Sequence, residues 1–436
     1  MEQKHYNIVF VICHDLGRHL GCYGATDVRS PHIDAFASGS TRFQNSFCTA
    51  PQCSPSRAAL WTGRFAHANG VVGLTHADFA NDLHPGELHL AQILRSAGYD
   101  CHLFGGQHES RSAARCGYET VHPGGPCGDV AAEFSRYMAG RPAGAPKPLF
   151  ASIGFNEPHR PFARAADVTP LPPDSLTVLP YLPDIPAVRE DLSNIEASIA
   201  TVDRAFGQVV QAVRQSPIAA DTIVVFTADH GIAFPHAKMT LYDPGIEVAL
   251  IMAVPGGPQG VVRREMISNV DVLPTLLDLL GLPHPPNLHG RSFAELLRGG
   301  AYVPNEAVFA EKTYHTYYDP MRAIRTSRWK LIANFEFAPW QETSPDYDNN
   351  AKGYVEVARA LNVPYALQYH PAFELYDLEA DPYERHNLAD DPAHRHRRDE
   401  LIRTLRQWMV DTRDPLLDGP VAQATYRIRM AQFKAI

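Results

Sequence analysis

Short runs of apolar residues, many of them β-branched, alternate along the chain with segments of helical periodicity. The run at 7–13, NIVFVIC, is typical of a buried strand, and further runs of this kind stand at 99–104, 148–154, 222–228 and 248–254. Helical patterns lie between or beside these runs, at 30–39, 88–97, 129–139, 189–215 and 271–280. This alternation predicts an α/β fold in which a large mixed, mostly parallel sheet is sandwiched by helices.

The pattern changes in the last third of the chain. Residues 321–335 have the pattern of two strands with a turn between them, and 394–411 has that of an amphipathic helix. The segment 336–370 has no clear period, and we expect a long loop there. The sequence therefore predicts two domains: a larger α/β domain at 1–305, and a smaller α+β domain on an antiparallel sheet at 306–436.

Acids and histidines follow three of the predicted strands directly. His14 and Asp15 come after the first strand, His159 follows the strand at 148–154, and Asp229 and His230 follow the strand at 222–228. In an open α/β sheet the carboxyl ends of the strands form the edge where ligands bind. We therefore expect these side chains to gather at one edge of the sheet.

Composition narrows the kinds of partner that the protein binds. The net charge of −9 and a pI of about 6.1 argue against nucleic acid or an anionic membrane as a partner. No apolar stretch is long enough to cross a bilayer, and the first apolar run is too short for a signal sequence, so we expect a cytoplasmic protein. None of the seven cysteines forms a CxxC pair, and in a reducing compartment most should be small buried residues.

Cys53 is the exception, because polar loop residues surround it in the stretch TAPQCSPSRAALWTGR. A cysteine phosphatase would need an arginine six residues after the nucleophile, but position 59 is alanine and the arginine is Arg57. A free catalytic thiol paired with a histidine stays open, although nothing in the neighbouring sequence favours it.

The stretch from Cys53 to Arg64 resembles the signature of the type I sulfatases, C-x-P-S-R-x-x-L-x-T-G-R, and has all eight of its fixed positions. The resemblance continues through TADHG at 227–231 to ELYDLEADPYERHNLADDP nearer the C-terminus. Within the family the chain is most similar to the heparan N-sulfatase (sulfamidase) branch, through stretches such as GIAFPHAKMTLYDPG. The resemblance implies an alkaline-phosphatase-like fold with the catalytic sulfatase domain at 1–305.

In this family the cysteine is oxidised after translation to a formylglycine aldehyde, which implies a formylglycine-generating maturation enzyme as a partner. The hydrated aldehyde carries two hydroxyls, one of which attacks sulfur while the other later expels sulfate. A position at the start of a helix would add backbone N–H donors and the positive end of the helix dipole. Arg57, one turn further on, can hold the hydrated group, with a structural salt bridge as its alternative role.

The resemblance also implies one divalent metal ion, Ca²⁺ in the family, which polarises the sulfate and lowers the pKa of the attacking hydroxyl. The implied ligands are His14, Asp15, Cys53, Asp229 and His230. His14 stands where the family usually has aspartate, and its nitrogen suits Zn²⁺ or Mn²⁺ better than Ca²⁺. Alternatively, His14 holds Asp15 in place without contacting the metal.

Three further residues take acid–base and sulfate-binding positions by the same resemblance. His108 would deprotonate the hemiacetal sulfate, whereas His159 and Lys238 would serve leaving-group protonation and sulfate binding. The lysine that the family has two residues before the first of these histidines is missing, because Gly106 stands in its place. Further candidates for substrate contact are Arg18, Gln107, Arg160 and His236.

Three functions stay open. The first is a sulfatase that acts on a small anionic substrate with an O- or N-linked sulfate, such as a saccharide. The second keeps the fold and the formylglycine but hydrolyses phosphonate or phosphate esters, which the histidine-rich metal site favours. The third is a binding protein with a decayed site, against which the intact motif argues. The sequence also leaves open whether the chain forms a homo-oligomer.

Overall fold

The computed structural model describes residues 6–337 and 369–435. Its larger part is built on an eight-stranded mixed sheet with the order β4-β3-β5-β1-β6-β7-β2-β8. The strands are β1 (Asn7–Cys13), β2 (Thr41–Phe47), β3 (Asp100–Gly105), β4 (Thr120–Val121), β5 (Leu149–Phe155), β6 (Thr222–Ala228), β7 (Leu250–Ala253) and β8 (Val261–Ser268). Strands β3, β5, β1 and β6 pair in parallel, whereas β7 runs antiparallel to both β6 and β2.

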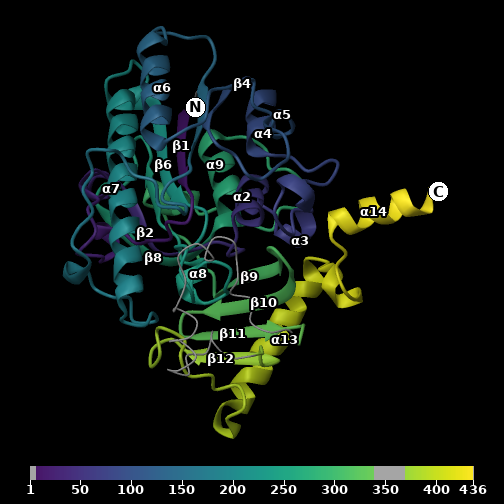
Figure 1. Ribbon diagram of the computed structural model, residues 1–436. Coiled ribbons are helices and arrows are strands. Elements are labelled where there is room, and N and C mark those ends of the chain that lie inside the picture. Colours follow the sequence, from purple (N-terminus) through teal and green to yellow (C-terminus); the bar gives the residue numbers. More distant parts are fainter. Residues whose placement is uncertain (1–5, 338–368, 436) are drawn as a thin grey trace.

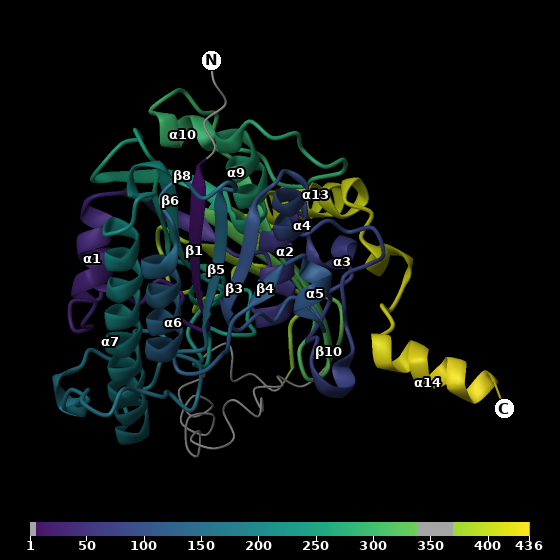
Figure 2. The same ribbon diagram turned by 90° about the horizontal axis from the view of Figure 1, so that it is seen from above.

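Helices cover both faces of this sheet (Figure 1 and Figure 2). One face carries α1 (Pro31–Ser38), α6 (Cys127–Gly140) and α7 (Pro186–Arg214), and the other carries α2 (Cys53–Thr62), α4 (Leu90–Ser96), α9 (Val272–Leu280) and α10 (Ala294–Arg298). Val9 and Val11 of β1 belong to the first of these two cores, and Ile8 and Phe10 belong to the second. A strand that is buried on both faces needs a continuous apolar run, which is what NIVFVIC provides.

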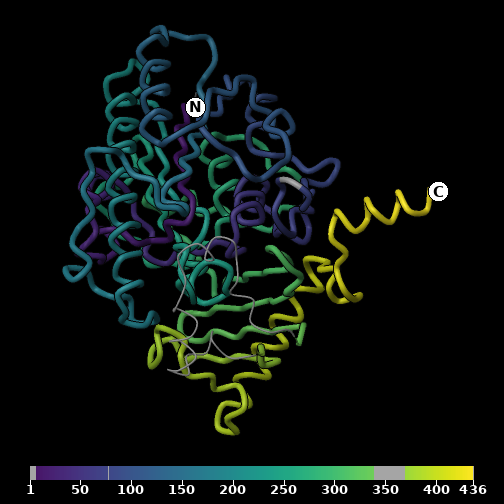
Figure 3. The backbone as a smooth tube through the Cα atoms, in the orientation of Figure 1, coloured from purple at the N-terminus to yellow at the C-terminus, as the bar shows by residue number. Residues whose placement is uncertain are grey.

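A four-stranded antiparallel sheet follows, with the order β12-β11-β10-β9. The last part of the chain, green to yellow in Figure 3, forms this second sheet and its helices. Leu405 and Trp408 of the long helix pack against the sheet, together with Ala59 and Phe65 from the larger part of the molecule. The elements of this part are β9 (Ala307–Tyr314), β10 (Tyr318–Thr326), β11 (Trp329–Asn334), β12 (Phe373–Asp377), α13 (Arg395–Asp411) and α14 (Ala424–Lys434). Three short helices lie earlier in the chain: α3 (Ala66–Asn69), α5 (Ala113–Cys116) and α8 (Asp243–Ile246).

The predicted fold class is confirmed, and each predicted strand and helix lies within three residues of an observed one. The sequence did not predict β2, β4, β8, β9 or α14, nor the short helices α3, α5, α8 and α10. The loop expected at 336–370 lies mostly outside the described residues, and the domain boundary near residue 305 stays a prediction. The seven cysteines are all free thiols. Among the described residues, no helix combines the length and the apolar character that a membrane span requires.

Candidate active site

The acids and histidines that follow β1, β5 and β6 lie together because these strands are neighbours. Strand β1 pairs in parallel with β5 on one side and with β6 on the other, so that Cys13 lies level with Phe155 and Ala228. The next residues of each strand therefore leave the sheet at the same edge. This geometry confirms the predicted gathering of polar side chains at the carboxyl ends of the strands.

Cys53 is the first residue of α2 and is buried, with 2% of its surface exposed. Its Sγ lies 3.2 Å from Nε2 of His230 and 3.9 Å from Oδ1 of Asp15. The N-cap residue, Gln52, places no side-chain hydrogen bond over the start of the helix. The partial positive charge of the helix terminus therefore lies at the position of Cys53.

Asp229 connects the parts of the site. Its Oδ1 accepts hydrogen bonds from the backbone N–H groups of Asp15 and His230, each at 2.9 Å. Its Oδ2 lies 3.0 Å from Nε of Arg57 and 3.0 Å from Nδ1 of His14. The backbone of Asp15 has a φ of 52°, which is uncommon for a residue other than glycine, and the bond to Asp229 helps to hold it there.

Asp15 also contacts two cationic or basic groups on its other side. Nζ of Lys238 donates a hydrogen bond to its Oδ2 at 2.8 Å, and Nε2 of His159 lies 3.8 Å from the same oxygen. Nζ of Lys238 lies 3.3 Å from Nε2 of His159. Burial alone would raise the pKa of Asp15, but Lys238, His159 and His230 outweigh it and hold the pKa well below its ordinary value, so the carboxylate is charged.

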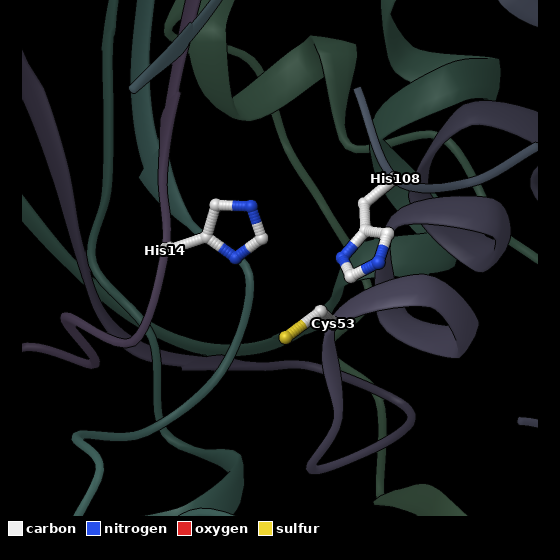
Figure 4. Close-up of side chains that lie close together, drawn as sticks. All are labelled: His14, Cys53 and His108. Atoms are coloured by element: carbon white, nitrogen blue, oxygen red, sulfur yellow. The ribbon is translucent and has the colours of Figure 1, made fainter. Parts of the chain in front are cut away.

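Two imidazoles border Cys53 from other directions (Figure 4). The ring of His14 lies 5.7 Å from that of His108 and 5.7 Å from that of His159. Burial lowers the pKa of His14 to about 4, with a further contribution from Arg57, and burial together with His14 and Arg57 lowers that of His108 well below its ordinary value. Both rings are therefore neutral and offer a lone pair to a metal ion or a proton.

The donor atoms of His14, Asp15, Cys53 and Asp229 all lie within 4.8 Å of one another, and all four side chains are buried. Nδ1 of His14 lies 3.0 Å from Oδ2 of Asp229. A buried imidazole beside two carboxylates is a donor set that fits a divalent cation. Nε2 of His230 lies 3.2 Å from Oδ1 of Asp15, within reach of the same cation.

The structure therefore brings His14, Asp15, Cys53, Arg57, His108, His159, Asp229, His230 and Lys238 together, while four weaker candidates contact other groups. Arg18 pairs with Glu247 and Arg160 with Asp191. The ring of His236 lies 2.8 Å from a backbone oxygen of Tyr383, and the Gln107 side chain bonds to the backbone of Ser110. Sequence reasoning did not find His76, whose Nδ1 lies 2.8 Å from Nε2 of His108, because a single loop histidine carries no motif.

The chain belongs to the sulfatase family, whose profile, described as Sulfatase, matches residues 6–282. A second profile, described as N-sulphoglucosamine sulphohydrolase, C-terminal, matches residues 230–352. The protein is therefore a hydrolase of the sulfatase class, and the predicted family and enzyme class are confirmed.

Named relatives span nearly the whole chain. N-sulphoglucosamine sulphohydrolase of Homo sapiens is 29% identical over 95% of this chain and 92% of its own length. An ulvan-active sulfatase of Formosa agariphila is 27% identical over 95% of this chain and 82% of its own length. The structure of a phosphonate monoester hydrolase of Agrobacterium radiobacter matches with a TM-score of 0.72 and 20% identity over 93% of this chain and 96% of that chain. This last similarity concerns the fold alone.

Proposed function

We propose that the enzyme hydrolyses a sulfate ester or sulfamate of a small molecule or saccharide, with a formylglycine made from Cys53 as the nucleophile and with a bound divalent metal. The observation that carries this proposal is the position of Cys53. It begins α2, and its Sγ lies within the donor set of His14, Asp15 and Asp229. A thiol at this position is a poor nucleophile, because burial raises the pKa of Cys53 well above its ordinary value.

The metal would be held by His14, Asp15, Asp229 and His230 together with the side chain at position 53. When bound, it would polarise the sulfate and lower the pKa of the attacking hydroxyl. Calcium takes oxygen ligands almost exclusively, whereas this set contains two imidazoles. We therefore favour Mn²⁺ or Zn²⁺ over the Ca²⁺ that the family resemblance implies.

Arg57 orients the nucleophile and the substrate. Its Nε donates to Asp229, and its Nη2 is buried with no hydrogen-bond partner among the described residues. A buried guanidinium N–H without a partner costs free energy unless a ligand accepts from it. An oxygen at position 53, or one of the sulfate oxygens, would be that acceptor.

The acid and the base act from different directions. The ring of His14 lies 5.7 Å from the ring of His108 and 5.7 Å from the ring of His159. His159 and Lys238, which contact Asp15, donate the proton that the leaving group needs. His108 takes up a proton at its ring nitrogen on the Cys53 side when sulfate is released. Two histidines in separate positions suit two separate proton transfers.

The catalytic domain comprises 1–305, and the smaller domain at 306–436 supports it. Ala59 of α2 belongs to the core that Leu405 and Trp408 of α13 complete, so the second domain fixes the helix that begins with Cys53. The partners of the chain are a small anionic sulfated substrate and a formylglycine-generating enzyme. The cytoplasmic location expected from the sequence stays a prediction.

A phosphonate or phosphate ester is the second candidate substrate, because the nitrogen-rich metal set departs from an all-oxygen site. Turnover of 4-nitrophenyl sulfate and of 4-nitrophenyl phenylphosphonate by the metal-loaded enzyme separates the two. We expect faster turnover of the sulfate, and its loss in Cys53→Ala but not in the control Cys48→Ala, which removes a different buried thiol. Faster turnover of the phosphonate would contradict the proposed substrate class.

A further inference from the structure

The exposed imidazole of His76 lies directly against His108. Nδ1 of His76 is 2.8 Å from Nε2 of His108, and the two rings are stacked with centroids 4.9 Å apart and planes 25° apart. Phe79 contacts the His76 ring edge-on at 5.6 Å. The contact is therefore a hydrogen-bonded and stacked pair of rings, one at the surface and one inside the site.

Residues beside Cys53 hold this pair in place. The backbone N–H of Thr75 donates to Oγ of Ser54 at 3.3 Å, and Oγ1 of Thr75 donates to the backbone oxygen of His108 at 3.0 Å. Ser54 is the second residue of α2 and follows Cys53 directly. The loop that carries His76, the loop that carries His108 and the start of α2 are thus tied together by one threonine.

The rest of the His76 loop is fixed from the far side. Nδ2 of Asn81 donates to the backbone oxygen of Leu74 at 2.9 Å, and Oγ1 of Thr425, at the start of α14, donates to the backbone oxygen of Asp78. The C-terminal helix therefore contacts the short 3₁₀ helix (Ala77–Phe79) that follows His76. His76 occupies a defined position although its ring is exposed.

The direction of the contact shows which ring nitrogen of His108 meets His76. Figure 4 shows one ring nitrogen of His108 on the side of Cys53 and His14, and the other on the far side. Nε2 is the nitrogen that meets His76, so Nδ1 faces Cys53. For Nδ1 to accept a proton, the ring hydrogen must be on Nε2, and it then donates to Nδ1 of His76. The hydrogen of His76 is in that case on its Nε2.

We propose that His76 is a positioning residue for His108: the hydrogen bond and the stacked contact hold the ring with Nδ1 facing Cys53 and with its hydrogen on Nε2. This inference rests on the proposed function, in which His108 acts as the base.

The test uses the formylglycine-containing, metal-loaded enzyme with an aryl sulfate. In His76→Ala we expect kcat to fall by about 10- to 100-fold, by analogy with the loss when the partner that orients a metal-bound histidine is removed. KM should stay unchanged, and added imidazole should restore part of kcat. His76→Gln has an amide oxygen that can still accept from Nε2 of His108, so its kcat should lie between those of the wild type and of His76→Ala.

His84→Ala is the matched control, because His84 is an exposed histidine of the same loop region with no described contact to His108. It should retain the wild-type kcat. A wild-type kcat in His76→Ala, an equal loss in His84→Ala, or a loss that imidazole does not restore would overturn the inference.

A second measurement does not depend on turnover and therefore separates this inference from the proposed function. Carbethoxylation of His108 by diethyl pyrocarbonate, followed by mass spectrometry, should increase in His76→Ala, because the ring that covers Nε2 is gone, and should not change in His84→Ala. Equal modification of His108 in the wild type and in His76→Ala would contradict the contact. A wild-type enzyme that turns over no sulfate ester, with the modification pattern as expected, would contradict the proposed function alone.

Discussion

Nζ of Lys238 lies 2.8 Å from Oδ2 of Asp15, and neither side chain has any surface exposed to solvent. Asp15 belongs to the donor set that fits a divalent cation. The lysine therefore compensates the charge of a buried carboxylate on the side that faces His159, whereas Oδ1 faces Cys53 and His230. The ammonium group of Lys238 and a bound metal ion would then both contact the carboxylate of Asp15.

This arrangement predicts that the metal rescues the loss of the lysine. Lys238→Met leaves the Asp15 carboxylate buried without its partner, which costs about 3–5 kcal/mol for a buried ion pair. We expect a loss of this size in the free energy of unfolding of the metal-free protein, measured with urea, and a partial recovery when Mn²⁺ is added.

Lys312 provides the control, because it forms a buried pair with Asp319 in the second sheet, at 2.5 Å. Lys312→Met should destabilise the protein as well, but Mn²⁺ should not recover that loss beyond its effect on the wild type. Equal recovery in both variants would show that the metal does not bind next to Asp15.

The proposed metal ligands can be tested by the metal content of the purified protein as well as by its activity. Asp15→Asn or Asp229→Asn removes a charged oxygen donor, so the purified protein should lose bound metal and most of its turnover. Asp167→Asn, which changes an exposed acid paired with Arg204, should keep both. Metal content is measured by inductively coupled plasma mass spectrometry.

We expect His14 to decide which metal ion the proposed site prefers. His14→Asp replaces a nitrogen donor by oxygen and should shift the preference of the site from Mn²⁺ or Zn²⁺ toward Ca²⁺. Competitive metal loading of the variant and the wild type measures the shift. If content and preference do not respond to this change, His14 is not a ligand and only holds Asp229, whose Oδ2 is 3.0 Å from it.

The two acid–base histidines should respond differently to the leaving group. Without His159, turnover of esters with poor leaving groups should fall most, because an activated aryl group departs with little help from a proton. Without His108, sulfate release should slow for every substrate, by about 10²–10⁴-fold for a positioned base. A leaving-group series and a burst measurement on His159→Ala and His108→Ala test this assignment. Equal leaving-group sensitivity and no burst in His108→Ala would show that the roles are assigned wrongly.

Gly106 offers room for a cation near His108. A Cβ atom at Gly106 would meet no other atom within 4 Å, and its φ is not in the left-handed region, so a side chain is tolerated there. Gly106→Lys should lower KM for a sulfated substrate by adding a positive charge near the anion, and Gly106→Gln, of similar length but neutral, should not. The same KM in both variants would mean that the side chain at 106 does not reach the substrate.

In the eight-stranded sheet, the sequence predicts the central strands β3, β5, β1, β6 and β7 and misses β2, β4 and β8, which lie at or next to its edges. Strand β1 has a continuous apolar run and was predicted within its true limits, whereas β2, TRFQNSF, has polar residues at half-exposed positions. Strand β8, VVRREMIS, is an edge strand whose first half is partly exposed. Both are strands because of pairing with segments more than 200 residues away, which local patterns do not record.

The residues of the candidate site also differ in whether the sequence predicts them. His14, Asp15, Asp229 and His230 could be predicted because they follow neighbouring parallel strands directly, and Cys53 because of its motif. The contact between His76 and His108 depends on how two loops fold against the start of α2, and no spacing in the sequence determines that. The ion pair of Arg18 with Glu247 and that of Arg160 with Asp191 could not be predicted for the same reason, because each joins residues that are far apart in the sequence.

The proposed reaction requires an aldehyde made from Cys53. The direct measurement is the mass of the tryptic peptide that covers 43–57, taken from protein co-expressed with a formylglycine-generating enzyme, together with the turnover of the same samples. The peptide also contains Cys48, which serves as an internal control because its thiol should remain unchanged. We predict an aldehyde at position 53 and turnover in proportion to the fraction converted. Full turnover by protein that retains the Cys53 thiol would contradict the account.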